Sequence, residues 1–178
     1  PEGACDGVTV GAAATAAYFP LLRGRRVAVL ANQTSRVGDE HLVDLLHRSG
    51  VRLTAIFSPE HGFRGTADAG EHVASSVDER TGGPIRSLYD GRTRRPSDEA
   101  MRSFDVLLVD MQDVGLRFYT YYISMLRMMD ACADFGRAVV VLDRPNPNGS
   151  YIDGPVLDMK YKSGVGALPI PVVHGLTL

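Results

Sequence analysis

Glu60 and His61 are the neighbouring residues whose types best suit acid–base chemistry. They stand between Pro59 and Gly62, and this punctuation predicts a rigid turn that holds the carboxyl group beside a titratable imidazole. A carboxyl group that is partly shielded from water has a raised pKa, which is what a general acid needs near neutral pH. The simpler alternative is that Glu60 only caps the turn that follows it.

Polar residues also follow four other short apolar runs of the sequence. The carboxyl ends of parallel strands meet at one edge of a sheet, and ligands bind there. We therefore expect a single polar edge that contains Asn32, Asp110, Gln112, Asp113, Asp143, Arg144, Asn146 and His174. Asp110 and Asp113 have three candidate roles: they orient the imidazole, bind a sugar hydroxyl or supply a second carboxylate. Alternatively, Asp110 caps the segment that starts the next helix.

Aromatic and proline-rich segments adjoin two of these predicted strand ends. Tyr119 and Tyr121 lie close to Arg117, and this combination suits a sugar ring or another ring-shaped ligand, although tyrosines also fill cores. Asn146 lies between two prolines, whose limited freedom would preorganise Asn146 or Arg144 for a ligand; the alternative is a simple turn.

The hydrophobic pattern predicts the strands and helices that must position these residues. Short apolar runs predict buried strands over 25–32, 51–57, 105–110, 138–142 and 169–173, and a shorter strand over 84–89. Helical spacing predicts helices that start near 42 and end before Gly50, and that cover 96–103 and 118–135. Residues 64–83 are predicted to form a long loop. The alternation predicts an α/β domain with a mostly parallel sheet.

Some side chains in these elements have structural interpretations. Core packing is the interpretation that we favour for one face of the third helix, made of Tyr122, Met125, Met129 and Cys132. His41 and His72 lack the spacing of metal ligands and are predicted on a helix surface or in a loop.

Composition excludes several classes of protein. With 178 residues, 44% hydrophobic and 22% charged, the chain fits one globular unit rather than a disordered or fibrous protein. A net charge of -2 provides no basic field for nucleic acid. No apolar run approaches the roughly 20 residues of a membrane span. The two cysteines form no metal-binding pair and no glycine-rich phosphate motif occurs, so we expect no metal and no cofactor.

Five segments of the chain, in one order, resemble a single family. They are Ser58–Gly65, Asp110–Gly115, Arg117–Tyr121, Asp143–Pro147 and Gly154–Val156. The chain resembles the NamZ/YbbC family of exo-β-N-acetylmuramidases from about Leu22 to its last residue. The resemblance implies a Rossmann-like N-terminal domain, a mostly parallel sheet flanked by helices, followed by a smaller α/β domain, with the active site in the cleft between them.

The resemblance also implies domain limits, an activity and its residues. We expect an N-terminal extension over 1–21 and the catalytic N-terminal domain over 22–178; the family's C-terminal domain, which completes the cleft, is absent, and this puts the activity of the chain alone in question. The family releases terminal N-acetylmuramic acid from peptidoglycan fragments. Its proposed catalytic acid corresponds to Glu60, beside His61. Our own hypothesis is that His61 and Asp113 tune or orient Glu60. Muramyl saccharides would be the partners, and the protein would be exported, periplasmic or in the cell envelope.

Glycoside hydrolysis usually also needs a second carboxylate. It would come from the absent domain, or it would be unnecessary if the substrate's own acetamido group attacks. Muramic acid carries a lactyl carboxylate, and a forked guanidinium pairs well with carboxylates, so Arg64 and Arg117 are candidates for binding it.

Two other functions fit the same residues. Strand-end carboxylates on parallel sheets often hold a divalent cation, and here the set for phosphate-ester hydrolysis would be Asp110, Asp113, Asp143 and His61. Alternatively, the domain binds cell-wall sugars or a partner chain without catalysis.

Overall fold

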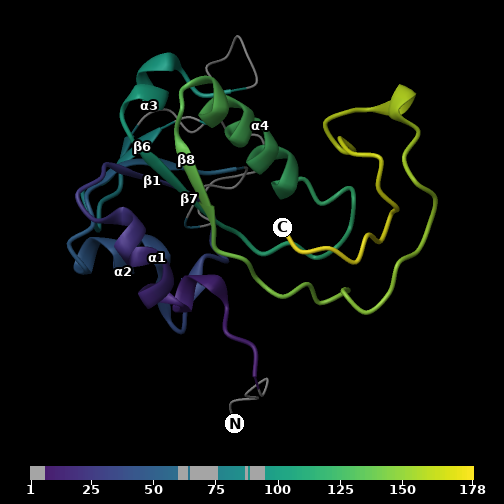
Figure 1. The fold of residues 1–178 in the computed structure, drawn as a ribbon, viewed down its shortest axis with the longest axis horizontal. Helices are drawn as coiled ribbons and strands as arrows, with labels where there is room; N and C mark the ends of the chain where they lie inside the picture. Colours follow the sequence, from purple (N-terminus) through teal and green to yellow (C-terminus); the bar gives the residue numbers. More distant parts are fainter. Residues whose placement is uncertain (1–6, 60–63, 65–75, 87, 89–94) are drawn as a thin grey trace.

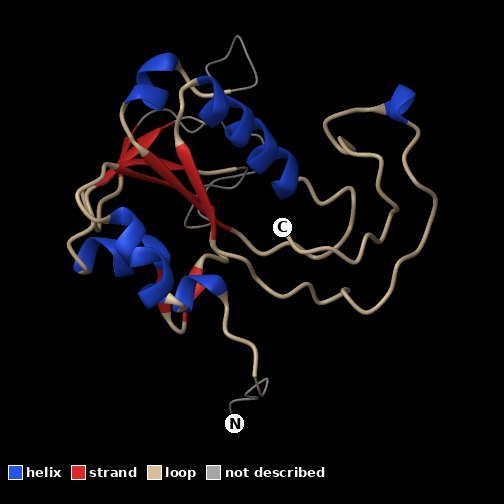
Figure 2. Ribbon diagram, viewed as in Figure 1, coloured by secondary structure: helices blue, strands red, loops and turns tan. Residues whose placement is uncertain are grey.

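The computed structural model describes residues 7–59, 64, 76–86, 88 and 95–178. They form a six-stranded sheet in the order β5-β6-β4-β1-β7-β8, with helices on both faces (Figures 1 and 2). Neighbouring strands from β6 to β8 are parallel, and β5 pairs with β6 in the antiparallel direction. The predicted α/β fold with a mostly parallel sheet is therefore confirmed.

Each element of the sheet is short, and most lie where the apolar runs predict them. The strands are β1 (Val27–Ala31), β4 (Leu53–Phe57), β5 (Ser76–Val77), β6 (Pro84–Arg86), β7 (Val106–Asp110) and β8 (Ala138–Val141), with a separate hairpin of β2 (Arg36–Val37) and β3 (Glu40–His41). The helices are α1 (Thr15–Leu22), α2 (Leu42–Arg48), α3 (Asp98–Arg102) and α4 (Tyr121–Asp134), with 3-10 turns η1 (Gly11–Ala13) and η2 (Met159–Tyr161).

The strand order reverses between β1 and β7. From β1 the chain moves outward through β4 to β6, and it then returns to the other side of β1 to form β7 and β8. In such sheets the loops after the two central strands diverge and leave a crevice at their carboxyl ends. The topology therefore directs attention to the residues that follow β1 and β7.

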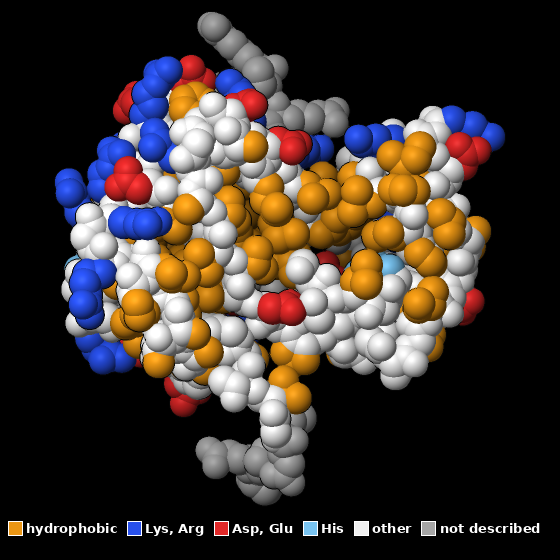
Figure 3. All heavy atoms as spheres, in the orientation of Figure 1, with side chains coloured by type: hydrophobic (Ala, Val, Ile, Leu, Met, Phe, Trp, Pro, Cys, Tyr) orange, Lys and Arg blue, Asp and Glu red, His pale blue; other side chains and the backbone are white. Residues whose placement is uncertain are grey.

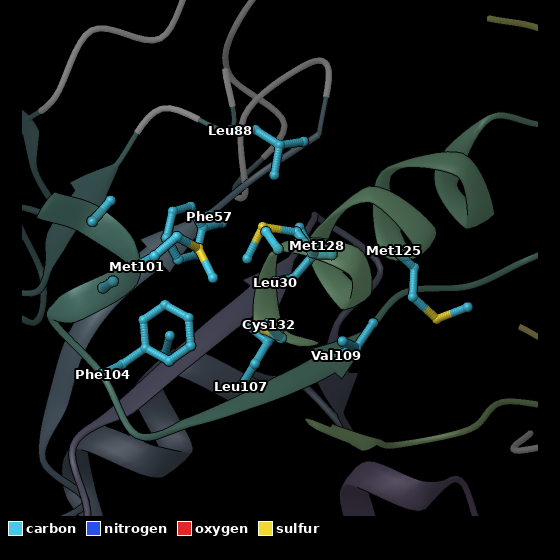
Figure 4. Packing of buried hydrophobic residues seen from close by; sticks show 14 of the residues in the cluster. Leu30, Phe57, Leu88, Met101, Phe104, Leu107, Val109, Met125, Met128 and Cys132 are labelled. Carbon is cyan, nitrogen blue, oxygen red and sulfur yellow. The ribbon is translucent and has the colours of Figure 1, made fainter. Parts of the chain in front are cut away.

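Two apolar clusters fill the two faces of the sheet. All residues of β1 and β7 are buried, as expected for central strands that are covered on both sides. Val27 and Val29 pack with side chains of α1 and α2, whereas Leu30 packs with side chains of α3 and α4. Figure 4 shows this second cluster, in which Met128 approaches Leu30. The central strands are therefore held rigidly from both faces.

Three predictions about individual elements are wrong. Residues 169–173 form no strand, because Pro169 and Pro171 offer no backbone N–H and only Val173 makes isolated bridges. On α4 the buried residue is Met128, whereas Met129 is 40% exposed, because the buried face recurs at positions 125, 128 and 132. His41 is 5% exposed, because its Nδ1 accepts the Val43 N–H at the start of α2.

Residues near both ends of the described chain bond to the segment after β8: the Gly11 N–H donates to the Asp143 carbonyl oxygen, and the Leu176 carbonyl oxygen accepts from Asn146 Nδ2. Near the N-terminus, Ala12, Tyr18 and Leu22 belong to the core, and the predicted limit of the domain at residue 22 stays a prediction. Residues 143–178, here called the C-terminal arm, form a long excursion with a single 3-10 turn (Figure 2). The Arg117 guanidinium secures it by donating to the carbonyl oxygens of Pro155 and Ile170.

Among the described helices, none has the length and apolar character needed to cross a membrane.

Candidate active site

The carboxyl edge of the sheet carries most of the predicted polar residues. Asn32 follows β1, Asp110 ends β7 and Arg144 follows β8, while the C-terminal arm returns His174 to the segment after β7. Hydrogen bonds or close contacts join the loops that hold Asn32, Asp110, Gln112, Asp113, Arg144, Asn146 and His174. The expected convergence at one edge is therefore present among the described residues.

Asn32 is the centre of the turn after β1. Its side-chain Oδ1 accepts hydrogen bonds from the backbone N–H and the hydroxyl of Thr34, at 2.9 and 2.5 Å. The Thr34 hydroxyl oxygen in turn accepts the Gln112 N–H at 2.9 Å, which ties the β1 turn to the β7 loop. Ser35 donates to the Asp110 carbonyl oxygen, and His41 Nε2 lies 2.8 Å from the Asn32 carbonyl oxygen. This turn is therefore held by a network of hydrogen bonds, with Asn32 and Ser35 buried in it.

Asp110 and Arg144 form a buried, two-pronged ion pair. Arg144 Nε and Nη2 donate to the two carboxylate oxygens of Asp110 at 2.6 and 2.9 Å, and the Asp110 side chain is fully buried. Burial raises the pKa of Asp110, and the hydrogen bond and charge of Arg144 oppose that rise. Arg144 also donates to the Arg36 carbonyl oxygen, so the pair fastens three loops together. These two side chains hold each other, and their predicted contact with substrate stays a prediction.

Asp113 faces His174 from the neighbouring segment. Asp113 Oδ1 accepts the Gly115 N–H at 2.7 Å and lies 3.8 Å from His174 Nε2. His174 Nδ1 accepts the Leu176 N–H, so the ring presents its Nε2 to the carboxyl group. Burial raises the pKa of Asp113, while backbone hydrogen bonds and the electrostatic effect of His174 oppose that rise. A buried carboxyl group beside an imidazole is an arrangement that can hold or move a proton.

Gln112 and Asn146 fasten the loops on either side of this pair. Gln112 Nε2 donates to the carbonyl oxygens of Asp113 and Pro145, at 2.6 and 2.8 Å. Asn146 Nδ2 donates to the Leu176 carbonyl oxygen at 2.8 Å. Both side-chain amides therefore hold the backbone of neighbouring loops in place.

The two arginines predicted for the lactyl carboxylate already have partners. Arg64 makes four hydrogen bonds with the carboxylates of Asp44 and Asp78, which raise the pKa of its guanidinium. Arg117 is bound to backbone carbonyl oxygens of the C-terminal arm. Binding of a lactyl carboxylate by either residue stays a prediction, and it requires these partners to be shared or exchanged.

The tyrosines after β7 form a partly exposed aromatic corner. The rings of Tyr119 and Tyr121 pack edge to face, with centroids 4.9 Å apart. Burial raises the pKa of Tyr119, and the phenol of Tyr121 and the charge of Asp113 add to the rise. An aromatic face beside polar groups suits a sugar ring.

Glu60 and His61, the predicted catalytic pair, lie outside the described residues. The chain that leads to them is described as far as Pro59, two residues after the end of β4. Because β4 is the parallel neighbour of β1, Pro59 follows a strand end at the same edge as Asn32. The sequence-based expectation for Glu60 is therefore untested by the geometry.

Three polar residues of this edge were not among the predicted site residues. Thr34, Ser35 and His41 form the network around Asn32. The run of Asn, Thr and Ser after a buried strand is the signal that predicts such a turn, since these side chains bond to nearby backbone. His41 has no comparable signal in the sequence.

One cavity lies beside the β2–β3 hairpin and another lies at the opposite edge of the sheet. A cavity of about 590 Å³ lies beside the β2–β3 hairpin and is lined by charged residues that include Arg36, Asp44 and Arg64. A cavity of about 660 Å³ lies near Arg25 and Arg52, which precede β1 and β4, at the opposite edge of the sheet. Within the described ranges, no three His, Cys, Asp or Glu side chains are placed to share a metal ion.

The fold and this edge define an α/β protein with a candidate ligand site at the carboxyl ends of a parallel sheet. A family model described as "Exo-beta-N-acetylmuramidase NamZ, N-terminal" matches residues 27–178, and the chain belongs to that family.

Longer relatives agree with this assignment. The chain is 44% identical over 164 residues to "Peptidoglycan beta-N-acetylmuramidase NamZ" of Bacillus subtilis (strain 168), a match that covers 90% of this chain and 39% of the relative. Crystal structures are known for two DUF1343 family proteins from Bacteroides fragilis NCTC 9343. Their sequences are 56% and 38% identical to this chain, and each structure matches it with a TM-score of 0.83. Each match covers 94% of this chain and 43% of the other. The chain thus spans about two fifths of the length of these relatives.

Proposed function

We propose that this chain is the part of a glycosidase that releases terminal β-linked N-acetylmuramic acid from peptidoglycan fragments. The observation that carries the proposal is the convergence of Asn32, Asp113 and His174 at the carboxyl edge of the sheet, in a chain that belongs to the NamZ family. The relative from Bacillus subtilis, named as a peptidoglycan β-N-acetylmuramidase, supports the substrate class.

In this proposal Glu60 is the general acid and base. It protonates the glycosidic oxygen as that oxygen leaves the anomeric carbon, which bonds instead to the substrate's own acetamido oxygen or to a second carboxylate; Glu60 then takes a proton from the water that displaces this group. His61 and Asp113 tune or orient that carboxyl group. The aromatic corner of Tyr119 and Tyr121 supports the sugar ring.

The proposal also assigns a place to this chain in the longer protein. The Rossmann-like domain forms one wall of the active-site cleft, and the region that follows it in the longer relatives forms the other. The reaction belongs to recycling of the cell wall. Because peptidoglycan lies outside the cytoplasmic membrane, the protein acts after export, in the periplasm or the cell envelope.

The test is hydrolysis of a chromogenic β-N-acetylmuramide by the 178-residue chain and by a form extended with the C-terminal region of its relatives. We expect release by the extended form. Glu60→Gln should lower kcat by about 10²- to 10⁴-fold, which is the usual contribution of a general acid. Glu99→Gln is the matched control, because its side chain on α3 is 85% exposed and should leave turnover unchanged.

Two results would overturn the proposal at different points. Wild-type turnover by Glu60→Gln would remove that residue from the reaction. If neither form of the protein released the chromophore, the muramidase activity itself would be wrong.

A further inference from the structure

Among the described residues, one polar atom of the Asn32 side-chain amide has no partner. The Asn32 N–H donates to Ser35 Oγ, and its carbonyl oxygen accepts from Ser35 N and contacts His41 Nε2. Its Oδ1 accepts twice from Thr34, and this fixes which end of the amide is oxygen. Within the described part of the chain, Nδ2 has no acceptor, although Asn32 is fully buried.

Asp113 has an unpaired acceptor among the described residues, where Asn32 has an unpaired donor. Its Oδ1 accepts the Gly115 N–H, whereas Oδ2 has no donor among the described residues. Asp113 is 3% exposed, and the nearest cation-forming group, His174 Nε2, is 3.8 Å from Oδ1, beyond hydrogen-bond range. Leaving a buried donor or acceptor unpaired is costly, so such atoms call for a specific partner.

The two unpaired atoms belong to adjoining segments of one edge. The hydrogen bond from Gln112 N to Thr34 Oγ1 joins the turn that contains Asn32 to the loop that contains Asp113. Figure 3 shows that the surface is hollowed between the body of the molecule and the C-terminal arm, with an acidic side chain at depth and a histidine at its border. A fixed donor and a fixed acceptor therefore stand on neighbouring loops at the predicted sugar site.

We propose that Asn32 and Asp113 recognise the 2-acetamido group of the sugar, with Asn32 Nδ2 donating to its carbonyl oxygen and Asp113 Oδ2 accepting its N–H. This inference rests on the proposed function, which supplies an N-acetylated sugar as the ligand. The acetamido group is the one substituent of such a sugar that offers an acceptor and an N–H donor on separate atoms. The bond from N–H to a carboxylate is charge-assisted and therefore strong.

Both atoms are enclosed in the ligand-free structure, so the sugar reaches them by displacing what covers them. Loop movement of this kind is common where ligands bind. The proposal also gives Asp113 a different part from tuning the acid, because it then touches the substrate and selects it.

The experiment measures binding by NMR titration of the extended form, which includes both walls of the proposed cleft, with the 178-residue chain titrated in parallel. The two probes are the methyl glycoside of N-acetylmuramic acid and its analogue with a 2-O-acetyl ester, which keeps the carbonyl oxygen and lacks the N–H. We expect the wild-type chain to bind the acetamido sugar at least about tenfold more tightly, because the ester leaves Asp113 Oδ2 unpaired.

Two variants should respond in different ways. In Asp113→Asn the new amide keeps its oxygen on the Gly115 N–H, so its NH₂ faces the sugar N–H and the preference for acetamido over ester disappears. Asn32→Asp replaces the donor for the carbonyl oxygen, so it weakens both probes by a similar factor. Asp153→Asn is the control, because that exposed carboxylate also accepts a glycine N–H, at 2.7 Å, and has no part in the proposed contacts with the acetamido group.

The same spectra report whether each variant is folded, and the outcomes separate the inference from the function. Equal binding of acetamido and ester sugars by the wild type, equal weakening of both by Asp113→Asn, or no binding of any N-acetylated sugar would overturn the inference. If the protein hydrolysed the muramide but bound acetamido and ester sugars equally well, the proposed function would hold and the inference would be wrong. A preference for methyl N-acetylglucosaminide over its 2-O-acetyl analogue, without any binding of muramic sugars, would support amide recognition and reject the muramidase.

Discussion

Replacing Gly115 by alanine should destabilise the protein through two separable effects. Gly115 has φ +73°, a left-handed conformation that costs an L-residue about 1–2 kcal/mol. A Cβ at this position would also lie 2.3 Å from Nδ2 and 2.8 Å from Cγ of Asn146, and crowding of this kind costs about 1–3 kcal/mol. The free energy of unfolding should therefore fall by about 2–5 kcal/mol in Gly115→Ala.

Urea denaturation at pH 7 measures the change, and Gly136→Ala isolates the first effect. Gly136 has φ +61°, and a Cβ there meets nothing within 4 Å. Its substitution should cost only the backbone term, about 1–2 kcal/mol. The effect of alanine on the unfolded chain is common to both variants, so it cancels in their difference.

A double-mutant cycle tests the second effect. Asn146→Ala removes the atoms that the new Cβ would meet, at the loss of the bond to the Leu176 carbonyl oxygen. Gly115→Ala combined with Asn146→Ala should therefore cost about 1–3 kcal/mol less than the sum of the single variants. Additivity within about 0.5 kcal/mol, or equal losses in Gly115→Ala and Gly136→Ala, would refute the close approach of these two loops.

Three further predictions concern stability. Arg144→Leu should lower the free energy of unfolding by about 3–5 kcal/mol in urea at pH 7, because Asp110 is left as a buried, unpaired carboxylate; a smaller loss at pH 4 would confirm the cause. Burial of Asp78 is outweighed by hydrogen bonds from Arg64 and Thr81, which lower the pKa of Asp78 to about 2. Its ionised form therefore contributes about 2 kcal/mol of stability above pH 4, which is lost as the pH falls toward 2, and Asp78→Asn should flatten this acid limb of a thermal-denaturation series. Met128→Ala should cost about 2–5 kcal/mol in urea, against less than about 1 for Met129→Ala; equal losses would contradict the helix orientation.

The central sheet could be predicted from the sequence because β1 and β7 are apolar at every position up to their polar ends. Such a run has one physical explanation, burial on both faces. The rule that strand ends converge also placed Asn32, Asp110 and Asp113 at one edge. Segment 169–173 shows the limit of the method, because its apolar residues cover the loop after β7 instead of adding a strand.

The partners of the polar residues could not be predicted. The pairing of carboxylates with guanidinium groups depends on distances between loops, and a single sequence does not give these distances. Arg64 forms ion pairs with Asp44 and Asp78, and Arg144 forms one with Asp110. His41 illustrates the same limit. A histidine at the start of a helix is expected to be exposed, but here the neighbouring strand end covers it.

The C-terminal arm can lose its contacts with the rest of the protein, and with them part of the candidate site, while the sheet stays folded. Its backbone is held by hydrogen bonds between loops, such as those from Arg117, and not by strands of the sheet, while each ordered residue loses about 1–2 kcal/mol of chain entropy. Such a segment can open as a unit of its own while the sheet stays intact. Because His174 meets Asp113 only through the docked arm, a population with full secondary structure can include molecules in which this part of the edge is unassembled.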